Sequence, residues 1–92
     1  MLPESVLREM ARTVIRDGKL PSQHPDRTWG GPGVGAACAV CDRPVTREQL
    51  EFEIQFAHDG ERPGLDKYHV HLRCFAAWEF ERHEMPRIGG SR

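Results

Sequence analysis

The sequence predicts an α+β domain with one small hydrophobic core. Three patterns support this class: apolar residues at helical spacing near the N-terminus, an alternation of apolar and polar residues in the middle, and a second helical spacing near the C-terminus. The chain has 92 residues, of which 38% are apolar, so it can bury one modest core. These residues therefore do not form a multidomain enzyme.

Residues 1–17 are expected to form an amphipathic helix. Apolar side chains recur every three or four residues and gather on one face of a helix. They are Leu2, Val6, Leu7, Met10, Ala11, Val14 and Ile15. Asp17 and Gly18 then form a sequence typical of a helix end. We expect the apolar face to pack within the chain, and pairing with a second copy or another protein is the alternative.

Residues 18–37 are rich in Gly and Pro and show no periodicity, so we expect a loop that acts as an arm. Trp29 lies in this arm and is too large an apolar surface to leave in water, so we expect it to anchor the arm to the domain. The run Gly30–Gly35 is a weak candidate for a phosphate-binding loop. It lacks the preceding strand and the closing Lys-Ser or Lys-Thr, which favours a connector.

A β-hairpin and a helix are predicted in the C-terminal half. Apolar and polar residues alternate over residues 50–56, as in a strand with one buried face, and Glu51 and Glu53 make the other face acidic. Turn-forming residues follow, and residues 67–70 alternate again as a shorter strand. Helical spacing then runs from residue 72 to about Glu84, where Met85-Pro86 stops the helix. The chain therefore divides into helix 1–17, arm 18–37, finger 38–85 and a mobile tail 86–92, in one compact domain.

All three cysteines belong to one pattern, Cys38-x2-Cys41 and, after 29 intervening residues, His71-x2-Cys74. Two residues between ligands let a tight turn or a first helical turn direct both side chains at one tetrahedral ion. The pattern predicts one zinc ion bound by Cys38, Cys41, His71 and Cys74. His69 is the alternative fourth ligand, and His71 is favoured because its spacing to Cys74 repeats that of the first pair.

Four protein ligands leave no open coordination position, so the zinc is expected to be structural and the chain is not expected to be an enzyme. A knuckle, a hairpin and a ligand-bearing helix in this order describe a treble-clef finger. The alternatives for the cysteines are a redox Cys-x-x-Cys pair or burial without metal. Neither accounts for His71-x2-Cys74. The enzyme motifs His-Glu-x-x-His and His-x-Glu before Cys-x-x-Cys are absent.

The pattern Cys-x2-Cys-x29-His-x2-Cys, followed by Phe75 and Trp78, resembles the zinc fingers of poly(ADP-ribose) polymerases and DNA ligases that sense DNA breaks. It is more distantly similar to half of a LIM domain, and also to small, uncharacterised bacterial zinc-binding proteins with one such finger. The resemblance covers residues 38–84. It implies the same four ligands and a core position for Phe75.

The charge distribution favours a protein partner. Residues 38–85 contain six basic and ten acidic side chains, a net charge of −4, and three thiolates with one Zn²⁺ add a further −1. A finger that binds DNA through phosphate is expected to be positive. The alternative is nucleic-acid binding through Arg8, Arg12 and Arg16, which repeat along the N-terminal helix. If they do not bind nucleic acid, we expect these arginines to be solvated and partly paired with Glu4 and Glu9.

Location is predicted from the absence of targeting features. The N-terminus lacks a basic stretch followed by an apolar run, and no stretch of about 18 apolar residues occurs, so no membrane span is expected. An odd number of cysteines cannot close into a full set of internal disulfides. We therefore expect a cytoplasmic protein. The sequence does not determine its oligomeric state.

Overall fold

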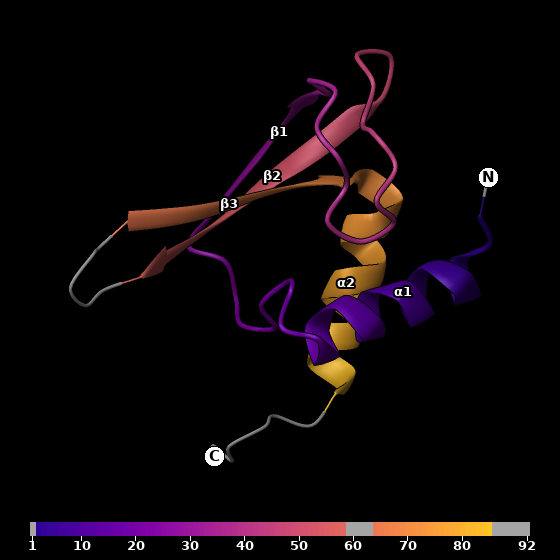
Figure 1. The fold of residues 1–92 in the computed structure, drawn as a ribbon, viewed down its shortest axis with the longest axis vertical. Helices are drawn as coiled ribbons and strands as arrows, with labels where there is room; N and C mark the ends of the chain where they lie inside the picture. The colour runs from indigo at the N-terminus through magenta and orange to yellow at the C-terminus, as the bar shows by residue number, and fades with distance from the viewer. Residues whose placement is uncertain (1, 59–63, 86–92) are drawn as a thin grey trace.

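The computed structural model describes residues 2–58 and 64–85 of the chain. In chain order its elements are helix α1 (Glu4–Arg16), strands β1 (Arg27–Pro32), β2 (Leu50–His58) and β3 (Gly64–His71), and helix α2 (Leu72–Glu84). Figure 1 shows both helices on the same side of the sheet. The predicted α+β class is confirmed. The predicted tail 86–92 and the tip of the hairpin lie outside the described residues.

The three strands form an antiparallel sheet in the order β1-β2-β3. The hairpin of β2 and β3 is confirmed, with Glu53 opposite His69, and β3 begins earlier than predicted, at Gly64. The expectation of a loop throughout residues 18–37 is wrong, because β1 pairs with β2 over Arg27–Pro32. As an edge strand that is exposed along most of its length, β1 needs no alternation of apolar residues.

One face of the sheet packs against α2. Phe52 on β2 contacts Phe75 on α2 with ring centroids 4.5 Å apart, and Phe56 lies edge-on to Trp78 at 6.2 Å. Trp78 is fully buried, and Phe75 packs against the core as the resemblance implied. Because side chains alternate along a strand, Glu51 and Glu53, on either side of Phe52, belong to the opposite face.

Helix α1 packs against the far side of α2, with Leu7 and Ala11 buried. Intramolecular packing of its apolar face is therefore confirmed. The predicted pair of Arg8 with Glu4 is present, with 2.9 Å between Nη2 and Oε2. The expected pairing of Arg12 with Glu9 is wrong, since Arg12 instead binds the buried carboxylate of Glu81 on α2 at 3.0 Å.

The arm is anchored by Leu20 and Pro21 rather than by Trp29. Leu20 is fully buried, and the indole N–H of Trp78 donates a hydrogen bond to the carbonyl oxygen of Pro21 over 2.8 Å. Trp29 is 57% exposed, so its predicted anchoring role is wrong. Trp29, on β1, lies opposite Glu53 of β2. Its side chain therefore belongs to the sheet face that α2 does not cover.

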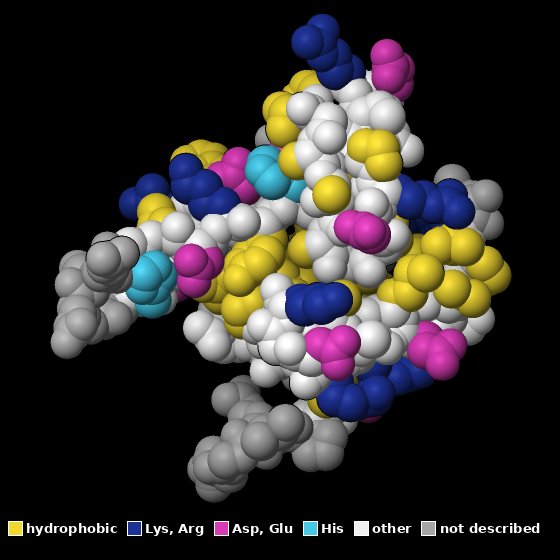
Figure 2. All heavy atoms as spheres, in the orientation of Figure 1, with side chains coloured by type: hydrophobic (Ala, Val, Ile, Leu, Met, Phe, Trp, Pro, Cys, Tyr) yellow, Lys and Arg dark blue, Asp and Glu magenta, His cyan; other side chains and the backbone are white. Residues whose placement is uncertain are grey.

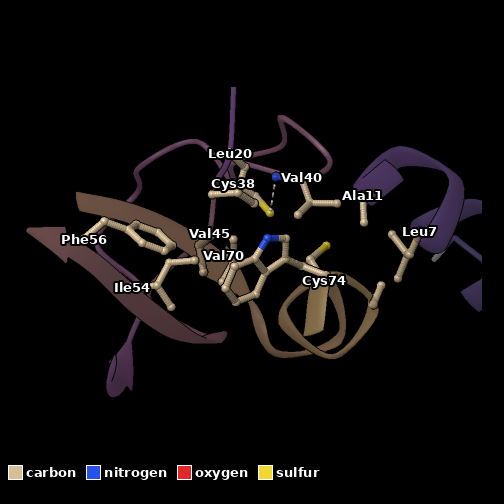
Figure 3. Packing of buried hydrophobic residues seen from close by; sticks show 12 residues of the cluster. Leu7, Ala11, Leu20, Cys38, Val40, Val45, Ile54, Phe56, Val70 and Cys74 are labelled. Atoms are coloured by element: carbon tan, nitrogen blue, oxygen red, sulfur yellow. Dashed lines mark hydrogen bonds between the residues drawn. The ribbon is translucent and has the colours of Figure 1, made fainter. Parts of the chain in front are cut away.

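The core unites both helices, the sheet and the loop before β2. Figure 3 shows Cys38 and Cys74 among its aliphatic and aromatic members, with Val40 and Ala11 close by. The core residues are Leu7, Ala11, Leu20, Cys38, Val40, Val45, Ile54, Phe56, Val70, Cys74, Ala77 and Trp78. Within the described ranges, neither helix is long and apolar enough to cross a bilayer.

Candidate metal centre

Cys38 and Cys41 lie on a tight knuckle closed by backbone hydrogen bonds. The Cys38 N–H donates to the carbonyl of Arg43, and the Asp42 N–H donates to the carbonyl of Cys38, both over 2.9 Å. Asp42 closes the turn with a φ of 68°, a left-handed conformation that a short polar residue tolerates. The Val40 N–H donates to Cys38 Sγ over 3.4 Å. The chain reversal brings the two sulfur atoms to one side of the knuckle.

His71 and Cys74 come from the junction of β3 and α2. His71 is the N-cap residue of α2 with extended backbone angles, and Cys74 lies in the first helical turn. Residues three apart on a helix end share a face, so both side chains point the same way. The Ala39 N–H donates to the carbonyl of His69 over 2.8 Å, which ties the knuckle to β3 two residues before His71.

The four predicted ligands converge on one point. The Sγ atoms of Cys38, Cys41 and Cys74 and one ring nitrogen of His71 all lie within 4.8 Å of one another. His71 Nδ1 is 3.4 Å from Cys41 Sγ and 3.8 Å from Cys74 Sγ. Ligands bound tetrahedrally at about 2.3 Å for sulfur and about 2.0 Å for nitrogen lie about 3.5 Å apart. The observed spacing therefore matches a tetrahedral site.

The imidazole of His71 is oriented by the knuckle. Its Nε2 lies 3.3 Å from the carbonyl oxygen of Pro44 and donates a hydrogen bond to it. The proton of a neutral imidazole is then on Nε2, and the lone pair of Nδ1 points toward the sulfur atoms. This arrangement, in which the second ring nitrogen donates to a backbone carbonyl, is usual for histidines that bind metals.

The thiols influence one another strongly because two of them are buried. The hydrogen bond with Cys74 lowers the pKa of Cys38 to about 4. Burial raises the pKa of Cys41, and the pKa of Cys74 is raised by its hydrogen bond to Cys38 and by burial. Once one cysteine of this cluster is ionised, ionisation of the second and the third is therefore disfavoured. A divalent cation relieves this repulsion, so the donor set of Cys38, Cys41, His71 and Cys74 fits one metal ion.

His69, the alternative ligand, lies outside this group. Its Nδ1 is 3.0 Å and 3.1 Å from the two carboxylate oxygens of Glu51, on the sheet face away from α2. Possible ligand atoms of Glu51, Glu53 and His69 also lie within 4.8 Å of one another. The sequence reasoning missed this second group, although two glutamates at i and i+2 in a strand signal a shared face.

The arginines of α1 make contacts within the chain. Besides its pair with Glu4, Arg8 lies over the ring of Phe80 at 4.0 Å, and Arg12 binds Glu81. Arg16, in the last turn of α1, is exposed. The structure thus uses two of the three arginines to join α1 to α2.

Comparison with known proteins identified no relative of this chain. No protein-family model, no curated protein and no solved structure matches the chain.

Proposed function

We propose that this chain is a small module in which one structural zinc ion supports a surface for protein interaction. The observation that carries the zinc assignment is the convergence of three sulfur atoms and one imidazole nitrogen within 4.8 Å. Thiolate and imidazole ligands in tetrahedral geometry favour Zn²⁺ over the hard cations Mg²⁺ and Ca²⁺. A knuckle, a hairpin and a ligand-bearing helix together correspond to a treble-clef finger.

The zinc is proposed to be structural. Cys38, Cys41, His71 and Cys74 complete a four-coordinate site without a water molecule, so no position is left to activate a substrate. The metal joins the knuckle to the start of α2, two segments separated by the whole hairpin. Apparent binding energies of roughly 10–16 kcal/mol for structural zinc exceed the stability of many small domains.

Native mass spectrometry of the purified chain tests the zinc assignment. We expect one zinc ion per chain, and its loss on treatment with a strong chelator. A metal-free chain that keeps its circular dichroism and melting temperature contradicts the structural role. An open coordination position, detected by X-ray absorption of the bound zinc, contradicts it as well.

The protein-interaction role is supported by Trp29 on the sheet face that α2 leaves uncovered. Leu65 on β3, next to the hairpin tip, belongs to the same face and is also exposed. Tryptophan is among the residues enriched in the side chains that dominate binding energy in protein interfaces. The acidic residues Glu51 and Glu53 share this face, which disfavours phosphate as its ligand.

Affinity capture at two salt concentrations discriminates a protein partner from nucleic acid. We expect a protein that is retained at high salt and after nuclease treatment, and is lost with Trp29→Ala. Material lost at high salt and with Arg16→Glu supports the alternative, nucleic-acid binding through the exposed end of the Arg8, Arg12, Arg16 series. Arg16 is the appropriate test residue because, unlike Arg8 and Arg12, it forms no ion pair or ring contact with α2 in the described structure.

A further inference from the structure

A cavity of about 480 Å³ opens beside the metal centre. Its wall is built from the first turns of α1, the knuckle, the end of the loop before β2 and the first turn of α2. Three of the four candidate metal ligands, Cys41, His71 and Cys74, form part of this wall. Figure 2 shows hydrophobic side chains gathered over the first turns of α1, next to basic side chains. The volume includes the space next to these three ligands, and it lies in the range typical of small-molecule sites, roughly 300–1,000 Å³.

Four leucines supply the apolar part of the cavity. Leu2 and Leu7 come from the start of the chain, and Leu50 and Leu72 come from the beginning of β2 and of α2. Leu50 is 58% exposed and Leu72 is 38% exposed, so both present apolar surface to water. An aliphatic chain placed among these leucines would remove that surface from water, which is favourable in proportion to the area covered.

Two arginines supply the charge. Arg43 on the knuckle and Arg73 on α2 line the same cavity, and none of the described residues that line it is an aspartate or a glutamate. Within residues 2–58 and 64–85, neither guanidinium pairs with a carboxylate of the chain. A guanidinium group binds a carboxylate through two parallel hydrogen bonds, so a pair of free arginines favours a ligand of this charge.

We propose that this cavity binds a small aliphatic carboxylate, with the hydrocarbon chain among the leucines and the carboxylate between Arg43 and Arg73. The cavity combines an apolar wall with two guanidinium groups, whose charge of +2 outweighs the −1 of three thiolates with one Zn²⁺, and this selects against neutral and cationic ligands of the same length. The proposal rests on the zinc part of the proposed function, because the metal holds the knuckle, and with it Arg43, beside α2.

Octanoate is the probe for this site. Zinc-loaded, ¹⁵N-labelled protein is titrated with octanoate, octan-1-ol and octylamine while amide resonances are followed by NMR. We expect octanoate to shift the amides of Leu50, Leu72 and Arg73 in a saturable manner, and to bind at least about tenfold more tightly than octan-1-ol. Equal binding of the three ligands overturns the proposal. A response confined to the surface of α1 around Val6 and Met10 overturns the proposal as well, and so does the absence of any response.

Matched variants test the two halves of the site separately. Arg43→Gln with Arg73→Gln is expected to weaken octanoate binding about tenfold and leave octan-1-ol unchanged, whereas the control Arg47→Gln changes neither. Leu50→Ala with Leu72→Ala is expected to weaken both ligands, and the control Leu65→Ala neither. Unchanged octanoate binding in the double arginine variant overturns the proposal.

Zinc content is measured by native mass spectrometry in every sample, so the two proposals fail in different ways. A purified chain that binds no zinc contradicts the proposed function. A zinc-loaded chain that does not bind octanoate contradicts only the ligand site. If a variant loses zinc, the comparison of the three ligands on the unmodified chain decides the question.

Discussion

The imidazole of His71 is held by the backbone of Pro44: its Nε2 lies 3.3 Å from the Pro44 carbonyl oxygen, and its Nδ1 faces the sulfur atoms. The knuckle therefore supplies two of the candidate sulfur ligands and also orients the candidate nitrogen ligand. His69, two residues earlier on β3, has its imidazole bound to Glu51 instead. The structure thus gives different partners to the favoured histidine, His71, and to the alternative, His69.

This difference predicts the effect of replacing each histidine. His71→Ala removes a ligand, so we expect the affinity for zinc to fall by at least about 100-fold, as measured by competition with a chromogenic chelator. His69→Ala, the matched control, is expected to keep one zinc ion per chain with an affinity within about tenfold. The assignment fails if His69→Ala loses zinc while His71→Ala retains it.

Removal of the metal is expected to disrupt the contact between the knuckle and α2 and to unfold the helix. Cys38 and Cys74 are both core residues, and without a cation their thiols are crowded together in a buried space. We expect loss of helical circular dichroism on chelation and its recovery on addition of zinc. Magnesium is the control and should not restore the signal, because it prefers oxygen ligands.

The ion pair between Arg12 and Glu81 is expected to stabilise the packing of α1 on α2. The Glu81 side chain is only 5% exposed, so Arg12→Ala leaves a buried carboxylate without its partner. We expect a loss of about 1–3 kcal/mol in the free energy of unfolding, measured by urea denaturation of the zinc-loaded protein. Arg16→Ala should change it by less than about 0.5 kcal/mol. Similar losses in both variants would mean that general charge, rather than this pair, is responsible.

Gly33 is expected to be intolerant of any side chain. A Cβ at this position would overlap the backbone carbonyl groups of Val45 and Thr46, which cannot move without disturbing the loop before β2. Gly31→Ala is the control, since its Cβ would meet nothing within 4 Å. We expect Gly33→Ala to destabilise the protein by about 1–3 kcal/mol or more and Gly31→Ala to change stability by less than about 1 kcal/mol. Equal melting temperatures would contradict the close approach.

Substitution of Trp78 is expected to lower the stability of the protein, whereas substitution of Trp29 is not. Trp78 is buried and its indole N–H is bonded to Pro21, so Trp78→Phe should cost about 1–3 kcal/mol of stability. Trp29→Phe should leave stability nearly unchanged and remove the fluorescence that acrylamide quenches. If quenching persists in Trp29→Phe, the exposed fluorophore is not Trp29.

The class of the fold, both helices, the hairpin and the pattern of Cys38, Cys41, His71 and Cys74 could all be predicted from the sequence. Each of these depends on a local period or a short spacing: three or four residues for α1 and α2, two residues for β2, and two intervening residues in each of the pairs Cys38/Cys41 and His71/Cys74. Such patterns are visible in the sequence because the residues that share a face or a turn are close together in the chain.

Contacts between residues distant in the chain could not be predicted from these local patterns. Strand β1 escaped prediction because an exposed edge strand is stabilised by backbone hydrogen bonds to β2, which leave no apolar alternation. Contacts across the sheet or between helices determine the exposure of Trp29, the partner of Arg12 and the different partners of His69 and His71. The cavity beside the metal centre arises in the same way, where leucines and arginines from four separate segments are brought together by packing.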